Sequence, residues 1–129
     1  MCAADAASFY HLLWHCPDMQ AYWLRVTQFL HDNMGTPVGM DPKLCLLGLV
    51  PDVDVDKYQN IFMCESLFVA RKVVAKAWMR ERAPTLEDWK REVNTTLPYR
   101  RMIYIQRGHP QKFSIVWDRW LADGETCTV

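Results

Sequence analysis

The stretch VDKYQNIFMCESLFVARKVVAKAWMRER, residues 55–82, decides the fold of this chain. Its apolar side chains recur at steps of three and four residues, which is the period of an α-helix. A helix over these 28 residues would be about 42 Å long at 1.5 Å per residue. This length makes it the scaffold on which the other segments pack. The side chains that we expect it to bury are Tyr58, Ile61, Phe62, Leu67, Phe68, Val73, Val74, Ala77 and Trp78.

Shorter helices are predicted on both sides of this scaffold. The aspartates within residues 52–56 favour the start of the long helix through capping and the helix dipole. Thr85 and Asp88 form a capping-box pattern, and Pro98 breaks or kinks the helix that this pattern starts. The other predicted helical segments are residues 6–15, 18–34, a turn or two within 44–50, 86–96, 99–106 and 111–121. The predicted fold is therefore all-α, an irregular bundle of about 4–6 helices around the long helix.

The length and composition allow one compact domain. With 129 residues, half of them hydrophobic, the chain is long enough to bury a single core. Residues 1–35 combine a Cys/His motif with an amphipathic helix, and residues 36–129 are a helical carboxy-terminal region. We expect the two to pack as one unit, which is itself a fragment of a larger protein.

Several classes of protein are not indicated. The sequence has no secretory signal pattern and no run of about 18 apolar residues that could span a membrane. Its five cysteines lack paired spacing, which argues for a reducing compartment rather than a disulfide framework. We find no nucleophile elbow and no phosphate-binding glycine loop, so we expect no catalytic residue and no small-molecule substrate. The expectation is an intracellular protein, cytoplasmic or nuclear, that is not an enzyme.

The net charge of zero hides a strong asymmetry along the chain. Residues 1–60 hold seven acidic and three basic groups, a balance of −4, and residues 61–129 hold twelve basic and eight acidic groups, a balance of +4. Within residues 71–112, eleven basic groups stand against four acidic ones, a balance of +7. Any contact with phosphate is therefore expected in this basic band.

Aromatic residues are interleaved with the basic band, a pattern found in surfaces that bind nucleic acid. The alternative is a charged helix surface over an aromatic core, and the spacing of Trp78 and Trp89 favours that alternative for these two side chains. The other aromatics of the band are Tyr99 and Tyr104. Arg100 and Arg101, which are adjacent and follow Pro98, are less easily explained as charges that only solubilise a helix surface. The predicted nucleic-acid contacts are Arg100, Arg101, Arg107, Lys90 and Arg91.

Near the amino terminus, Cys2, His11 and Cys16 have the spacing C-x8-H-x4-C and are candidate zinc ligands. A structural zinc site is tetrahedral, so a fourth ligand would have to be His15 or a cysteine upstream of this chain. His11 and His15 share a helix face, whereas His11 and Cys16 need a turn to converge. In the alternative interpretation, Cys16 is a small buried hydrophobe and the histidines are surface or packing residues.

This amino-terminal segment resembles the carboxy-terminal region of the second open reading frame of non-LTR (LINE-type) retrotransposons. The matching residues are His11, Trp14, Cys16, Pro17, Tyr22 and Trp23. In that family a Cys-x3-Cys-x7-His-x4-Cys cluster follows the reverse transcriptase. Cys2 stands one residue from the place of the second cysteine, and the first cysteine has no counterpart. Weaker similarities continue to the closing residues 113–120, so the resemblance spans nearly the whole chain.

The resemblance implies an accessory, non-catalytic segment of a retrotransposon polyprotein that helps to hold template RNA or target DNA beside an upstream reverse transcriptase domain. It also implies a zinc knuckle-like site in the intact parent protein. With only three ligands, we expect no zinc in this chain by itself. The alternative is a stand-alone helical structural or protein-interaction domain, or a decayed open reading frame without selected activity.

Overall fold

The computed structural model describes residues 14, 16–35, 38–48, 56–80 and 82–127. Within these ranges all regular secondary structure is helical, which confirms the predicted all-α bundle. The helix predicted over residues 6–15 falls almost wholly outside the described residues. The helices are α1 (Pro17–Met34), α2 (Pro42–Leu47), α3 (Lys57–Met79), α4 (Leu86–Gln106) and α5 (Pro110–Cys127).

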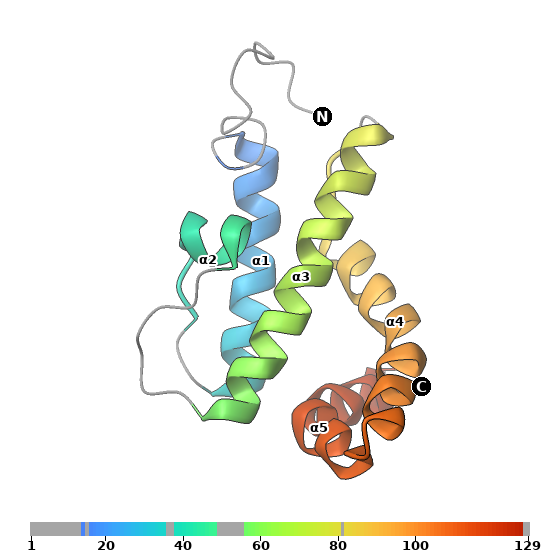
Figure 1. Ribbon diagram of the computed structural model, residues 1–129. Coiled ribbons are helices and arrows are strands. Elements are labelled where there is room, and N and C mark those ends of the chain that lie inside the picture. The colour runs from blue at the N-terminus through green and yellow to red at the C-terminus, as the bar shows by residue number, and fades with distance from the viewer. Residues whose placement is uncertain (1–13, 15, 36–37, 49–55, 81, 128–129) are drawn as a thin grey trace.

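The long helix α3 is the centre of the bundle, as its sequence predicts. It contacts each of the other four helices. Figure 1 shows α1 and α2 on one side of α3 and α4 on the other, with α5 lying across the end of the bundle where α3 begins. Helix α5 contacts α1, α3 and α4, and therefore ties the two sides together.

The ends of α3 follow from local chemistry. The carboxylate of Asp56 caps the helix, with Oδ2 accepting the backbone N–H groups of Tyr58 at 3.1 Å and Gln59 at 3.4 Å. This confirms the predicted capping role for Asp56, whereas Asp52 and Asp54 lie outside the described residues. At the other end, Met79 is the last helical residue, so α3 is 23 residues long and stops slightly before the predicted end.

Pro98 does not break the helix, as one of the two predicted outcomes would require, because α4 continues through this residue to Gln106 as one helix of 21 residues. A proline inside a helix removes one backbone donor and costs about 3 kcal/mol. The carbonyl that loses its donor is that of Asn94, and both Asn94 and Pro98 are exposed residues, so solvent can take the place of the missing N–H. Contacts of the following residues with α3 and α5 supply the remaining stabilisation.

Aromatic rings from four helices meet in the core. Trp89 of α4 and Trp120 of α5 lie 5.3 Å apart, and Phe29 of α1 lies 5.5 and 5.4 Å from them. Phe62 of α3 packs against Trp117 of α5 at 4.9 Å. All of these pairs are edge-to-face, the arrangement favoured by the charge distribution of aromatic rings. This aromatic cluster joins α1, α3, α4 and α5.

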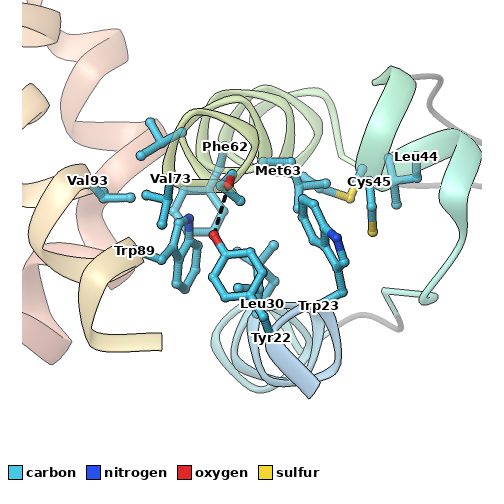
Figure 2. Packing of buried hydrophobic residues seen from close by; sticks show 14 of the residues in the cluster. Tyr22, Trp23, Leu30, Leu44, Cys45, Phe62, Met63, Val73, Trp89 and Val93 are labelled. Atoms are coloured by element: carbon cyan, nitrogen blue, oxygen red, sulfur yellow. Dashed lines mark hydrogen bonds between the residues drawn. The ribbon is translucent and has the colours of Figure 1, made fainter. Parts of the chain in front are cut away.

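The polar ends of buried aromatic residues are bonded to α3. The Tyr22 hydroxyl of α1 donates to the Ala70 carbonyl at 2.9 Å, a bond that crosses the core in Figure 2. The indole N–H of Trp89 donates to the Ser66 carbonyl at 3.0 Å. A buried donor without a partner is costly, so these bonds fix the orientation of both rings against α3.

Two aromatic side chains predicted to be buried on α3 are exposed instead. Phe68 is 59% exposed and Trp78 is 38% exposed. The ring of Phe68 lies 5.8 Å from the guanidinium carbon of Arg71 instead of in the core. The helical period cannot show which sides of a long helix will be covered, and in the described part of the chain these two positions face outward.

Replacement of Trp89 by alanine is expected to lower the free energy of unfolding by about 3 to 5 kcal/mol, because it removes a wholly buried ring and leaves a cavity. Trp89→Phe should cost less, since it keeps a ring and loses mainly the bond to Ser66. Urea denaturation measures both. Met79→Ala is the control, because Met79 is 88% exposed and its loss should stay within about 0.5 kcal/mol. Equal effects of Trp89→Ala and Met79→Ala would contradict this description of the core.

Candidate nucleic-acid interface

Four of the five predicted nucleic-acid contacts belong to α4, and Arg107 is the residue that caps its end. Successive residues of a helix point in different directions, so these side chains do not share one surface. Arg100 is bonded inside the bundle, and Lys90 and Arg91 lie beside an aromatic ring and a carboxylate, respectively. Arg101 and Arg107 are exposed.

Arg100 faces the interior of the bundle. Its Nη1 lies 3.3 Å from Oε2 of Glu65 on α3, and only 19% of its side chain is exposed. Glu65 also accepts the Tyr104 hydroxyl at 3.1 Å and the Trp117 indole N–H at 2.9 Å. One carboxylate therefore joins α3, α4 and α5, and Arg100 is engaged in holding the fold together.

Glu65 is the important residue that sequence reasoning did not single out. It is the only acidic residue between Lys57 and Arg80, and this isolation on a long, largely apolar helix was the available signal. Burial, together with the charge and hydrogen bond of Glu65, raises the pKa of Tyr104 to about 12. Tyr104, one of the predicted interleaved aromatics, is therefore a neutral donor within this network at ordinary pH.

Lys90 and Arg91 lie near the start of α4 and have neighbours of different kinds. The Lys90 ammonium lies 4.5 Å from the centre of the Phe29 ring on α1, at cation–π distance. Arg91 Nη1 is 3.6 Å from Oδ1 of Asp88, and 74% of the Arg91 side chain is exposed. Arg91 is thus accessible to a ligand, whereas Lys90 is partly covered by the protein.

Arg101 and Arg107 are both exposed. The sequence from Val93 to Trp117 contains no acidic residue, so no acid near them in the chain neutralises their charge. Exposed apolar side chains surround them, among them the Tyr99 ring, which is 67% exposed. We use the name α4 outer face for the exposed apolar and basic side chains of residues 99–107, which are Tyr99, Arg101, Met102, Ile103, Ile105 and Arg107. Tyr99, Ile103 and Arg107 follow one side of the helix, whereas Arg101, two residues from Tyr99, points to another side.

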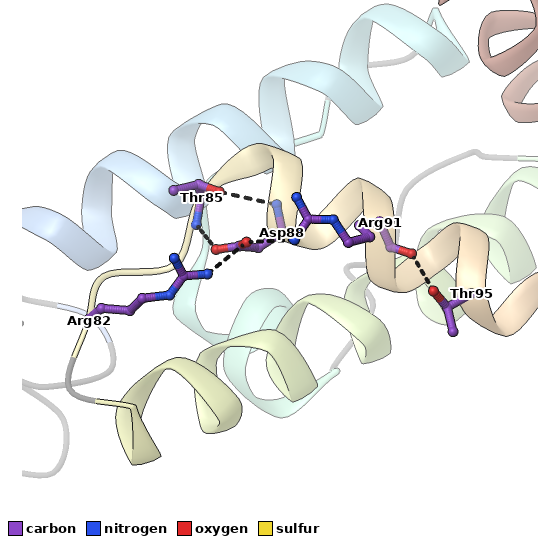
Figure 3. Close-up of polar contacts among 5 residues, drawn as sticks. All are labelled: Arg82, Thr85, Asp88, Arg91 and Thr95. Atoms are coloured by element: carbon purple, nitrogen blue, oxygen red, sulfur yellow. Dashed lines mark hydrogen bonds and ion pairs between the residues drawn. The ribbon is translucent and has the colours of Figure 1, made fainter. Parts of the chain in front are cut away.

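The carboxylates at the start of α4 have lowered pKa values. Burial alone would raise the pKa of Asp88, but hydrogen bonds with Thr85 and the charges of Arg82 and Arg91 lower it below its usual value of 3.8. For Glu92, the hydrogen bond from Lys76 is the largest cause, and it outweighs burial. Figure 3 shows Asp88 between Thr85 and the guanidinium groups, which is the predicted capping box with two additional cations.

The predicted zinc ligands Cys2 and His11 lie outside the described residues, as does His15. Cys16 precedes α1 and is wholly buried, as the packing interpretation predicts. In the part of the chain that the structure describes, no three His, Cys, Asp or Glu side chains are grouped so that they could hold a metal ion. The zinc site of the parent protein remains a prediction.

Two cysteines of the bundle are protonated at neutral pH. Burial raises the pKa of Cys45 to about 12 and also raises that of Cys64, which is half-buried rather than fully buried as its sequence context predicts. A thiol reacts as a nucleophile only through its thiolate. Neither residue is therefore activated for nucleophilic chemistry.

No protein-family model and no solved structure matches this chain. None of the helices in the described ranges is long and apolar enough to cross a membrane. Inference about function therefore depends on the residues of the chain and on their geometry.

Acidification should remove the stabilisation that Asp88 supplies. Because its pKa is lowered in the folded state, this contribution is present above about pH 4 and is lost as the pH falls through the folded-state value. At neutral pH, Asp88→Asn is expected to cost about 1 kcal/mol. This cost should shrink in acid, as denaturation midpoints at a series of pH values would show. The control is Glu87→Gln, an exposed acid in the same helical turn, and an equal cost for both variants would contradict the prediction.

Removal of the Glu65 carboxylate should destabilise the bundle more than the loss of a surface charge. Glu65→Ala leaves Arg100, Tyr104 and Trp117 without their shared acceptor, and we expect it to cost about 2 to 3 kcal/mol in urea denaturation. Glu65→Gln keeps one acceptor oxygen and should cost about half as much. If Glu65→Ala matched Glu87→Ala, the network would have no structural importance.

Proposed function

We propose that this chain is a non-catalytic, carboxy-terminal segment of a LINE-type retrotransposon reverse transcriptase polyprotein, and that it contacts RNA or target DNA through the α4 outer face. The family assignment is supported by the residues from His11 to Trp23 that resemble the retrotransposon motif. The contact is supported by the location of exposed arginines and an exposed aromatic ring on one stretch of α4.

The single observation that carries the nucleic-acid proposal is that Arg101 and Arg107 are exposed within a stretch of sequence, residues 93–117, that contains no acidic residue. An arginine paired one-to-one with a carboxylate is neutralised, whereas these two are exposed and have no ion pair among the described residues. Contacts between such cations and phosphates release counterions and provide affinity without sequence preference. Tyr99 adds a flat apolar surface on which an unpaired base can stack.

The α4 outer face is suited to an accessory contact rather than to strong binding. Tyr99, Ile103 and Arg107 are spaced four residues apart and therefore follow one side of the helix. Two arginines neutralise about two phosphates, which corresponds to a weak dependence on salt for a single strand. The upstream reverse transcriptase domain would supply the rest of the affinity.

A protein-interaction domain is the second candidate function. Met102, Ile103 and Ile105 are 56%, 46% and 50% exposed, and phosphate contacts do not need aliphatic side chains. Exposed apolar groups that adjoin one another are typical of surfaces covered by another protein. In this alternative the same face binds a protein partner and not nucleic acid.

Binding to a fluorescently labelled single strand, measured by anisotropy at several salt concentrations, tests the proposed contact. We expect the affinity to fall as salt rises, and Arg101→Gln/Arg107→Gln to reduce the slope of log K against log salt by about 1.4. Tyr99→Ala should weaken binding by about 1 to 3 kcal/mol with little change of slope. RNA and DNA of the same sequence would reveal the preferred nucleic acid.

The matched control is Lys43→Gln/Lys57→Gln, which removes two exposed cations at the start of α2 and of α3. It should leave both the affinity and the salt slope nearly unchanged. Absence of salt-sensitive binding, or the same loss in both double variants, would count against the α4 outer face and favour the protein-interaction alternative.

The genomic reading frame upstream of Met1 tests the family assignment independently. An in-frame reverse transcriptase that ends shortly before Cys2 is expected. Stop codons in that frame, with a promoter directly before this chain, would contradict the assignment and leave the stand-alone domain or the decayed reading frame as the explanation.

A further inference from the structure

A second basic site lies between the carboxy-terminal half of α3 and the start of α4. Here the structure contains a cavity of about 200 Å³ that is open to the solvent. Val73 and Ala77, which are both buried, form its apolar floor. The charged groups that line it are Lys76, Arg80, Arg82, Asp88, Arg91 and Glu92.

Each carboxylate in this cavity is shared by two cations. Asp88 Oδ1 is 2.9 Å from Arg82 Nη2 and 3.6 Å from Arg91 Nη1, as Figure 3 shows. Glu92 Oε1 is 2.9 Å from Lys76 Nζ and 3.1 Å from Lys72 Nζ. One negative charge cannot neutralise two positive ones, so each cluster keeps an excess of one positive charge.

Arg80 adds a further cation, because it has no ion pair among the described residues. Five cations, including Lys72 at the rim, therefore stand against two carboxylates, an excess of +3. Glu81, between Arg80 and Arg82, lies outside the described residues, and even if it is counted the excess is still +2. A chain with zero net charge thus concentrates positive charge around one hollow.

Stability of the fold does not account for this arrangement. Two cations would suffice to pair the two carboxylates, and exposed ion pairs typically contribute less than about 1 kcal/mol. The ion-paired cations remain accessible, since the side chains of Lys72, Lys76, Arg82 and Arg91 are about half exposed or more. An anion above the apolar floor could accept hydrogen bonds from several of them while the carboxylates keep them in place.

We propose that this cavity, the α3–α4 pocket, binds a phosphate group. The excess of positive charge is large enough to balance the one or two negative charges of a phosphodiester or phosphomonoester, and guanidinium groups match the geometry of phosphate oxygens. A volume of about 200 Å³ compares with about 30 Å³ for one water molecule in the liquid, so the pocket holds a phosphate together with bound water. The group could belong to a nucleic acid or to a free phosphate compound.

The α3–α4 pocket lies about two helical turns from Tyr99, the first residue of the α4 outer face. Arg91, Thr95 and Tyr99 follow each other at steps of four residues and therefore lie along one side of α4. The rise of a helix places Tyr99 about 12 Å along the axis from Arg91. A strand that stacks on Tyr99 would bring a phosphate near the pocket. Phosphate binding itself is independent of the proposed function, whereas its assignment to a nucleic acid rests on that function.

Titration of inorganic phosphate into the full chain tests the site, with backbone and arginine side-chain NMR signals as the readout. We expect saturable shifts at Arg80, Arg82 and Arg91 that chloride at the same ionic strength does not produce. Arg80→Gln/Arg91→Gln should weaken phosphate binding by at least about tenfold. Arg80→Gln alone should weaken it in the same direction, and it provides the test if the double variant fails to fold. Lys43→Gln/Lys57→Gln, which removes the same charge from exposed residues outside both the pocket and the α4 outer face, should leave phosphate binding unchanged.

Phosphate binding in the pocket would be contradicted if the shifts do not saturate or if chloride reproduces them. It would also be contradicted if the shifts persist unchanged in Arg80→Gln and in the double variant. A nucleoside monophosphate, a 5′-phosphorylated single strand and its 5′-hydroxyl form then distinguish the sources. Tighter binding of the single strands, weakened by Arg80→Gln, assigns the pocket to nucleic acid. If the monophosphate and inorganic phosphate bind equally and the single strands do not bind, the phosphate site is supported and the proposed nucleic-acid function is contradicted.

Discussion

The aromatic cluster at the junction of α1, α3, α4 and α5 is the constraint on which the rest of the structure depends. Its rings bury a large apolar area, and their polar atoms must find partners inside the bundle. Trp89 meets this requirement with a backbone carbonyl of α3, Trp117 with Glu65 and Trp120 with the side-chain oxygen of Asn94. Hydrophobic packing therefore brings the helices together, and a few hydrogen bonds determine how they are oriented.

Helix α4 shows how this constraint determines the surface. Its start is fixed by the capping box of Thr85 and Asp88 and by Trp89 in the first turn, and its second half by the bonds from Arg100 and Tyr104 to Glu65. With α4 held along its length, its remaining cations have definite positions. Arg91 near the start lines a cavity against α3, and Arg101 and Arg107 near the end are neighbours of exposed apolar residues.

Neighbouring arginines of identical chemistry have therefore acquired different roles. Arg100 completes a network inside the bundle, whereas Arg101, the next residue, is exposed. A rotation of about 100° per residue separates them on the helix. The same rotation separates Trp89 in the core from Lys90, which covers Phe29 at its edge. The distribution of charge along the sequence thus located the basic band of residues 71–112, but it did not show which of its cations are exposed and which are bonded inside the bundle.

Local patterns in the sequence were sufficient for the helical class, the long central helix, the cap at Asp56 and the capping box at Thr85, because each of these depends on residues close together in the chain. Only tertiary structure decided that α4 continues through Pro98, that Phe68 and Trp78 face outward, and that Glu65 is shared by three side chains. These outcomes depend on contacts between residues far apart in sequence, and the helical period carries no information about which helix lies opposite.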